Sequence, residues 1–148
     1  MEDIDALVRR FDPDRWLASR FITDAQARAD VIALYAFDYE LSRVAKVTSQ
    51  AIMGEIRLTW WADAIAEIFE GLPVRRHPVT LALAEAIARH GLRREPFDAV
   101  IDAYFPELDG QPADAKAAAY AVMSLAQAIL CGRADMEAAA EAWASRST

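Results

Sequence analysis

The feature that most constrains the fold is an uninterrupted apolar run in the first third of the chain, Val31–Phe37 (VIALYAF). A helix over this run is apolar on every face, and a helix that is apolar all round is buried on all sides. Upstream, Thr23–Gln26 (TDAQ) has the form of a capping box, with a hydroxyl three residues before Gln. These residues predict a long helix, from Thr23 to about Val47, at the centre of a helical bundle.

Pro, Gly and capping residues divide the rest of the chain into shorter helices. Thr48 or Ser49 is expected to cap a helix that reaches Glu70. Gly132 is expected to close a helix that begins at Ala113. Further helices are predicted over residues 1–10, 13–22, 79–90, 96–104 and 135–144. Alanine is abundant and no strand alternation is present, so the predicted fold class is all-α, an orthogonal or antiparallel helix bundle with residues 1–148 in a single domain.

Composition and charge argue against several classes of function. The chain is 55% hydrophobic and has a net charge of −7, without a basic stripe, so nucleic acid is not an expected partner. The one cysteine, Cys131, allows no intrachain disulfide and indicates a reducing compartment. The opening residues, MEDIDALVRR, do not resemble a signal peptide, and no stretch of about 18 apolar residues predicts a transmembrane segment. A cytoplasmic location is expected, with peripheral attachment to the inner membrane left open.

Two longer segments and several short ones occur in a distinctive order. The first is Leu17–Phe37 (LASRFITDAQARADVIALYAF), and the second is Glu55–Ile65, which contains the adjacent Trp60 and Trp61. Shorter segments follow at Gly71-Leu72-Pro73, His77-Pro78-Val79, Leu83–Ile87, Gly91-Leu92, Pro96-Phe97, Ile101-Asp102 and Tyr120–Leu125. In this order the chain resembles the squalene/phytoene synthase family, all-helical enzymes that join two prenyl diphosphates. The resemblance covers nearly the whole chain and implies part of the isoprenoid synthase fold.

The chain departs from that family at the position where its enzymes bind Mg²⁺. An aspartate-rich DDxxD-type motif follows the YAF residues in the family, and in an ungapped reading its acids fall here on Ser42, Arg43 and Lys46. Mg²⁺ needs oxygen ligands, usually carboxylates and phosphate oxygens, which basic side chains cannot supply. Arg43 and Lys46 are instead candidates for direct contact with a phosphate. No metal site and no cofactor are therefore expected, and Mg²⁺ enters only if a second chain supplies the missing acids.

One subset of the family is more similar to this chain than the true synthases are. The segment YAF-x-x-E-L-x-R-V, at Tyr35–Val44, is similar to members whose acidic motifs are eroded, among them a mitochondrial respiratory complex I assembly factor. That resemblance implies the loss of synthase chemistry. The chain also resembles only about the N-terminal half of the family's enzymes. Because a shortened bundle would leave an apolar helix face uncovered, a homodimer or a protein partner covering this face is expected.

Asp38 is the best remaining acidic candidate for a catalytic role near the lost motif. It lies about 200° around a helix from Glu40, so the two carboxylates cannot converge on one ion, and Glu40 is expected to pair with Arg43. The rings of Trp60 and Trp61 point about 100° apart, so one is expected in the core and the other near a groove or an interface. The candidate pocket for a substrate or a prenyl lipid comprises Phe21, Tyr35, Asp38, Ser42, Trp60 and Trp61.

Other polar residues are interpreted as structural. Asp63, Glu67 and Glu70 follow an i, i+4, i+7 pattern and are expected to form a solvated helix face. His90 suits the C-terminal end of a helix. Neither His90 nor His77 has a nucleophile in a recognisable motif nearby, so catalysis by either is not expected.

Three functions are compatible with these observations. The favoured one is a non-catalytic member of the family that acts through protein interaction, in the manner of an assembly factor, or by holding a prenyl lipid. The alternative is a head-to-head prenyl diphosphate transferase that is completed by a second chain and depends on Mg²⁺. The third is a helical adaptor that shares the fold alone, because fold does not dictate function.

Overall fold

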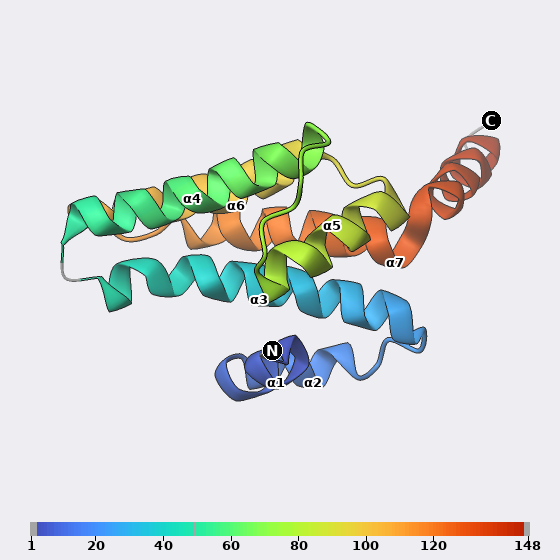
Figure 1. Cartoon of the computed structure of the whole chain (residues 1–148). Helices are drawn as coiled ribbons and strands as arrows, with labels where there is room; N and C mark the ends of the chain where they lie inside the picture. Colours follow the sequence, from blue (N-terminus) through green and yellow to red (C-terminus); the bar gives the residue numbers. More distant parts are fainter. Residues whose placement is uncertain (1–2, 49, 147–148) are drawn as a thin grey trace.

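The structure, a computed structural model, describes residues 3–48 and 50–146, with side chains described as far as Cys131. The described residues form seven α-helices and one 3₁₀ helix and contain no strand (Figure 1). They are α1 (Ile4–Phe11), α2 (Pro13–Ser19), α3 (Ala25–Val47), α4 (Ala51–Phe69), α5 (Pro78–His90), α6 (Arg94–Tyr104), η1 (Phe105–Asp109) and α7 (Ala115–Arg146). The prediction of an all-α fold is confirmed.

Helix α3 lies at the centre of the bundle, as the apolar run predicts. It contacts each of the other six α-helices. Helices α1 and α2 lie on one side of it, and α4 to α7 lie on the other side (Figure 1). Within Val31–Phe37, six side chains are at most 3% exposed, and Tyr35 alone is half-buried. The continuous apolar run therefore marks the core helix of the fold.

The two ends of α3 differ from the predicted capping pattern. Asp24, and not Thr23, is the N-cap, because its carboxylate accepts a hydrogen bond of 3.1 Å from the Ala27 backbone N–H. A carboxylate at this position also interacts favourably with the helix dipole. At the other end, the Thr48 hydroxyl donates to the Val44 carbonyl at 2.8 Å. Thr48 therefore closes α3 and does not cap α4, and Ser49 lies outside the described residues.

Helix α7 is continuous where two helices were predicted. It runs from Ala115 to Arg146 and passes through Gly132 without a break. A single glycine in a helix interior costs only about 1 kcal/mol relative to alanine, which a neighbourhood rich in Ala, Leu, Met and Glu can offset. The expected end at Gly132 is therefore wrong. No described helix combines the length and the apolar character that crossing a membrane would require.

A buried carboxylate connects α3 to the end of α5. Asp30 is 4% exposed, and Arg89 Nη1 donates to both of its oxygens at 2.8 and 2.9 Å. His90 Nε2 lies 2.7 Å from Asp30 Oδ2, and the Gln26 amide donates to Oδ1 at 3.2 Å. We call these four residues the Asp30 cluster. The sequence places His90 correctly at a helix end but does not reveal its carboxylate partner.

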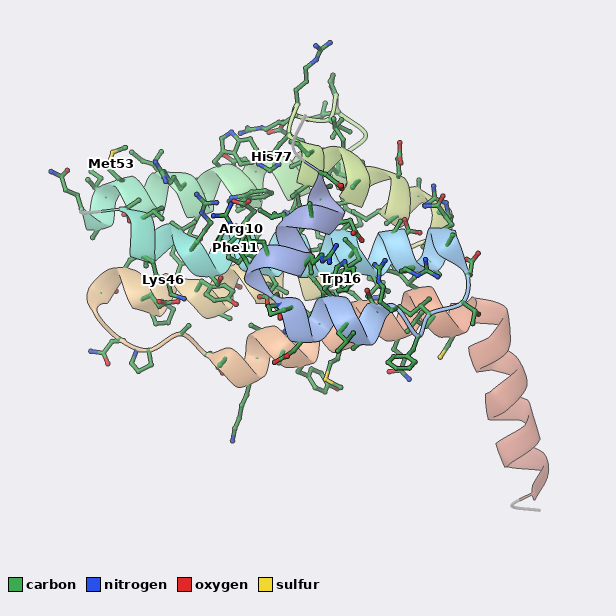
Figure 2. The ribbon with its side chains drawn as sticks, turned by 90° about the horizontal axis from the view of Figure 1, so that it is seen from below. Arg10, Phe11, Trp16, Lys46, Met53 and His77 are labelled. Atoms are coloured by element: carbon green, nitrogen blue, oxygen red, sulfur yellow. The ribbon has the colours of Figure 1, made fainter. Side chains whose placement is uncertain are left out.

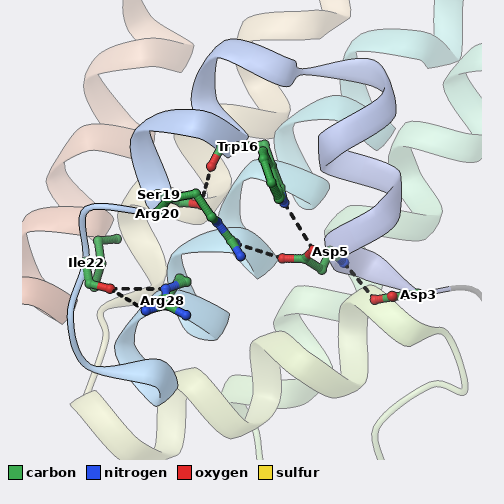
Figure 3. Close-up of polar contacts among 7 residues, drawn as sticks. All are labelled: Asp3, Asp5, Trp16, Ser19, Arg20, Ile22 and Arg28. Carbon is green, nitrogen blue, oxygen red and sulfur yellow. Dashed lines mark hydrogen bonds and ion pairs between the residues drawn. The ribbon is translucent and has the colours of Figure 1, made fainter.

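The two N-terminal helices are joined through Asp5 (Figure 3). Trp16 Nε1 and Arg20 Nη2 donate to the two oxygens of Asp5, at 3.1 and 2.8 Å. The Arg28 guanidinium donates twice to the Ile22 carbonyl, at 3.1 and 2.8 Å, and so holds the turn between α2 and α3. These contacts keep α2 beside α3 and position its arginine, Arg15, against the central helix.

Candidate functional site

The middle and C-terminal part of α3 presents two faces that the fold uses differently. Successive residues of an α-helix are rotated by about 100°, so residues three or four apart share a face. One face carries Tyr35, Asp38, Ser42 and Lys46, and another carries Glu40, Arg43, Val44 and Val47. His77 lines a pocket beside the second face. In Figure 2, the labelled residues Lys46 and His77 lie on opposite sides of the α3 ribbon.

The first face is closed by a hydrogen-bonded cluster around Asp38. The Asp38 side chain is buried, and Arg15 Nη1 from α2 donates to its Oδ2 at 2.8 Å. The Tyr104 hydroxyl from α6 donates to the other oxygen, Oδ1, at 2.6 Å. The Arg15 guanidinium also lies over the Tyr35 ring, 5.0 Å from its centroid. This group of four residues, the Asp38 cluster, joins α2, α3 and α6.

The protonation states of its members support a structural role. Burial and the hydrogen bond to Asp38 raise the pKa of the Tyr104 hydroxyl far above its ordinary value. Burial is the largest single influence on Arg15 and disfavours its charge, but the hydrogen bond to Asp38 and the nearby negative charges of Asp38 and Asp12 together outweigh it and raise the Arg15 pKa. Both partners therefore keep the protons that they donate to the Asp38 carboxylate throughout the neutral range.

Replacing Tyr104 by Phe is expected to reduce the loss of stability at alkaline pH. An unfolded tyrosine releases its proton near pH 10, whereas the raised pKa keeps Tyr104 protonated in the fold, so above about pH 10 the folded chain holds more protons. The Tyr104 contribution to stability is therefore complete below that pH and is lost as the pH rises. Urea unfolding from about pH 7 to about pH 11 should show a shallower decline for Tyr104→Phe than for the wild type. Tyr120→Phe is the control, because Tyr120 is exposed. Equal slopes for Tyr104→Phe and the wild type would contradict the assignment.

The residues on this face do not suit Mg²⁺. Both Asp38 oxygens accept hydrogen bonds from protein donors, and the Ser42 hydroxyl donates to the Tyr39 carbonyl at 2.7 Å. Lys46 is exposed. Among the described residues, no three or more His, Cys, Asp or Glu side chains are grouped closely enough to hold a metal ion. Mg²⁺ prefers an octahedral set of oxygen ligands, and the carboxylate on this face, Asp38, has both of its oxygens occupied by Arg15 and Tyr104.

The second face of α3 borders a pocket of about 240 Å³ between α3, α4 and the start of α5. We call it the Trp pocket. Trp61 is 6% exposed and Trp60 is half-buried, as expected for a pair with one ring in the core and one at a groove. The pocket is lined by Glu40, Arg43, Val44, Val47, Arg57, Trp60, Trp61 and His77.

The structure does not bring the predicted pocket residues together. Trp60 and Trp61 line the Trp pocket, and so does Arg43, one of the two predicted phosphate contacts. Tyr35 and Asp38 belong to the Asp38 cluster on the other face of α3, and Phe21 lies in the turn after α2 with 84% of its surface exposed. Ser42 and Lys46 do not line the Trp pocket either.

Sequence reasoning missed several residues of the Trp pocket. Glu40, Val44 and Val47 could have been found from their helical spacing around Arg43. Glu40 does form the expected pair with Arg43, at 3.8 Å. His77 has no such signal, because its position depends on how the loop between α4 and α5 folds. Its Nδ1 accepts a hydrogen bond of 3.0 Å from the Val79 backbone N–H and so caps α5.

Helix α7 carries a separate apolar surface. Tyr120, Met123 and Leu130 are 78%, 70% and 48% exposed. They border a shallow hollow of about 450 Å³ along the same helix. Large apolar side chains exposed at helical spacing are typical of a surface that contacts another molecule. The described part of the chain thus has an exposed apolar helix face of the expected kind.

Comparisons with known proteins agree with the sequence patterns. The family model for squalene/phytoene synthase matches residues 8–142. The protein named NADH dehydrogenase (ubiquinone) complex I, assembly factor 6, from Homo sapiens is 30% identical over 103 residues, which are 70% of this chain and 30% of that protein. The Bos taurus and Rattus norvegicus proteins of the same name are 29% and 30% identical with the same coverage. The chain therefore matches less than a third of the length of these relatives. No solved structure matches.

Proposed function

Because the chain belongs to the squalene/phytoene synthase family, we propose that it acts through protein binding, without prenyl-transfer chemistry, in the assembly of a respiratory NADH dehydrogenase. Its similarity to complex I assembly factors confirms the predicted resemblance to that subset of the family. The relatives bear that role in their names, and a role in assembly is supported at the level of the family.

The hydrogen bonds made by Asp38 are the main evidence for this proposal. It is the best surviving acidic candidate near the lost metal motif, and both of its oxygens are used by Arg15 and Tyr104 to join helices. A carboxylate that holds three helices together is not available to bridge a metal ion to a diphosphate. With serine at position 42 and lysine at position 46, the first face of α3 supports a structural role better than a catalytic one.

The exposed face of α7 is the surface that we assign to a protein partner. Its large apolar side chains, Tyr120 and Met123, are more than two-thirds exposed. A partner, or a second copy of the chain, would cover this face and bury that area. The proposed location is the cytoplasm, with peripheral attachment to the inner membrane where such a complex is built.

Deleting the gene in the source organism is expected to lower the amount of assembled NADH dehydrogenase, and the full chain should restore it. The measurement is NADH:ubiquinone oxidoreductase activity together with a native gel of the membranes. Met123→Glu should fail to restore assembly, because it places a charge on the proposed contact face. Leu17→Glu is the control, because Leu17 is an exposed apolar residue on α2. Normal assembly in the deletion strain would refute the proposal.

A second assay addresses the transferase alternative directly. The purified chain, with Mg²⁺ and farnesyl or geranylgeranyl diphosphate, is expected to release no pyrophosphate above the background of the buffer. Release that disappears in Asp38→Asn, in a protein whose circular dichroism spectrum is unchanged, would support the transferase and contradict a non-catalytic role.

A further inference from the structure

We infer that the Trp pocket is a binding site for a small anion with a compact apolar body, and that Arg43 and Arg57 hold the anion directly, without a metal ion. The pocket lies on the opposite face of α3 from Asp38, and of the three positions that correspond to the family's lost acids only Arg43 lines it. The inference goes beyond the proposed assembly role and is tested independently of it.

The floor of the pocket is a rigid aromatic surface. The Trp60 and Trp61 rings meet edge to face, with centroids 5.0 Å apart, and Trp61 packs in the same way against the buried Phe37 at 5.8 Å. On Trp60, the Arg75 guanidinium lies 5.3 Å from the ring centroid and is itself held by Glu67 at 2.6 and 3.1 Å. Both indoles are thus fixed by neighbouring side chains. A fixed indole surface favours a flat apolar group.

The rim of the pocket is cationic. Arg43 and Arg57 line it, and the carboxylate among the lining residues is Glu40. The Arg43–Glu40 contact, at 3.8 Å, is longer than a hydrogen bond, and Arg57 makes no ion pair within the described residues. Two guanidinium groups and one carboxylate leave a local excess of positive charge in a chain whose net charge is −7. Guanidinium groups that are not fully used inside the protein can bind a carboxylate or a phosphate in the two-pronged manner typical of Arg.

His77 adds a further N–H donor. Its Nδ1 accepts from the Val79 N–H, so the neutral ring carries its proton on Nε2. The ring packs edge to face against Trp61 with centroids 5.0 Å apart, at the wall of the pocket. An N–H donor next to two guanidinium groups complements an oxyanion and offers nothing to a cation.

The size of the pocket limits the apolar body. Its volume of about 240 Å³ is below the range of about 300–1,000 Å³ that encloses drug-sized ligands. A ring or a short branched chain fits this space, whereas a prenyl chain of farnesyl length would extend out of it. The geometry therefore points to a compact monoanion or monophosphate, and not to a long prenyl diphosphate.

The test is a titration of the purified full chain in EDTA with benzoate and with phenyl phosphate. The readout is the shift of the Trp60 and Trp61 indole N–H signals in ¹H–¹⁵N spectra, assigned with Trp→Phe variants. Saturable binding of either compound is expected, and the tighter of the two identifies carboxylate or phosphate as the preferred anion. Inorganic phosphate has the anion without the ring, and benzyl alcohol has the ring without the anion. Each should bind at least about tenfold more weakly than the tighter of the two test compounds. Tighter binding of farnesyl diphosphate than of phenyl phosphate in EDTA would overturn the assignment to a compact ligand.

Three charge-removing variants locate the site. Arg43→Gln and Arg57→Gln should each raise the Kd by about tenfold, since each removes charge-assisted hydrogen bonds to the anion. Lys116→Gln removes one positive charge from α7, which contributes no residue to the pocket, and should change the Kd by less than about twofold. Arg57 and Lys116 are exposed, so neither change should disturb folding. No saturation by about 10 mM, or an equal loss of affinity in Lys116→Gln, would refute the site.

Discussion

Asp38→Ala is expected to lower the free energy of unfolding by about 3 kcal/mol. Removing one partner of a buried ion pair typically costs about 3–5 kcal/mol, because the other charge remains without compensation. Arg15 is one-third exposed, at 32% of its side chain, so water screens part of that cost and the lower end applies. The change also leaves the Tyr104 hydroxyl without its acceptor. The measurement is urea denaturation followed by circular dichroism at neutral pH.

The control for this prediction is Asp102→Ala. Asp102 is an exposed acidic residue on α6, and its removal should change stability by less than about 0.5 kcal/mol. A second check is a double-mutant cycle with Arg15→Ala. The loss of stability in the double variant should be much smaller than the sum of the losses in the two single variants. An Asp38→Ala protein as stable as the wild type would show that the carboxylate is retained for another purpose, and metal binding would then be the first to examine.

Asp30→Ala is expected to have a larger effect, a loss of about 4 kcal/mol. Water screens Arg89, at 37% exposed, as it screens Arg15, but the Asp30 carboxylate is more enclosed than that of Asp38 and has more partners. The Asp30 side chain is 5% exposed, and Arg89, His90 and Gln26 all lose their acceptor when it is removed. Because the Asp30 cluster is the described ion-pair contact between α3 and α5, the end of α5 should also separate from α3 more readily. Amide hydrogen exchange of α5 would detect this, together with the urea midpoint.

The matched control is Asp98→Ala, which also removes an aspartate from an ion pair with arginine. In that pair the side chains of Arg94 and Asp98 are 44% and 41% exposed, and they lie one helical turn apart. Exposed pairs of this kind contribute about 0.3–0.5 kcal/mol, so its loss should hardly be measurable. If the two aspartate variants were equally stable, burial would not be the factor that makes Asp30 important.

The sequence predicts the helical class, the central helix and the division of the Trp pair, because these follow from local composition. The apolar run Val31–Phe37 must be buried, whichever helices of the chain pack around it. Contacts between residues that are far apart in the sequence cannot be predicted in this way. Asp30 meets Arg89 across 59 residues, and Asp38 meets Tyr104 across 66. These partners are chosen by how the helices pack, and no spacing in the sequence records that choice.

The candidate site likewise has features that the sequence predicts and contacts that it does not. The resemblance to synthases predicts which residues stand at the lost acidic positions, but it does not show what lies opposite each of them in the fold. Arg43 and Lys46 have equal charge and are three residues apart, yet only Arg43 lines the Trp pocket. The difference arises from the neighbours of α3, namely α4 and the His77 loop on one side and the N-terminal helices and α6 on the other.

The two faces of α3 also separate two kinds of evolutionary constraint on one helix. Substitutions at Asp38 are penalised through folding, whatever the protein binds, because three helices depend on that carboxylate. Substitutions at Arg43 or Val47 touch a solvent-accessible hollow and leave those contacts intact. A lineage can therefore lose an ancestral chemistry and acquire a different ligand by changing one side of this helix, while the other side preserves the architecture that both states share.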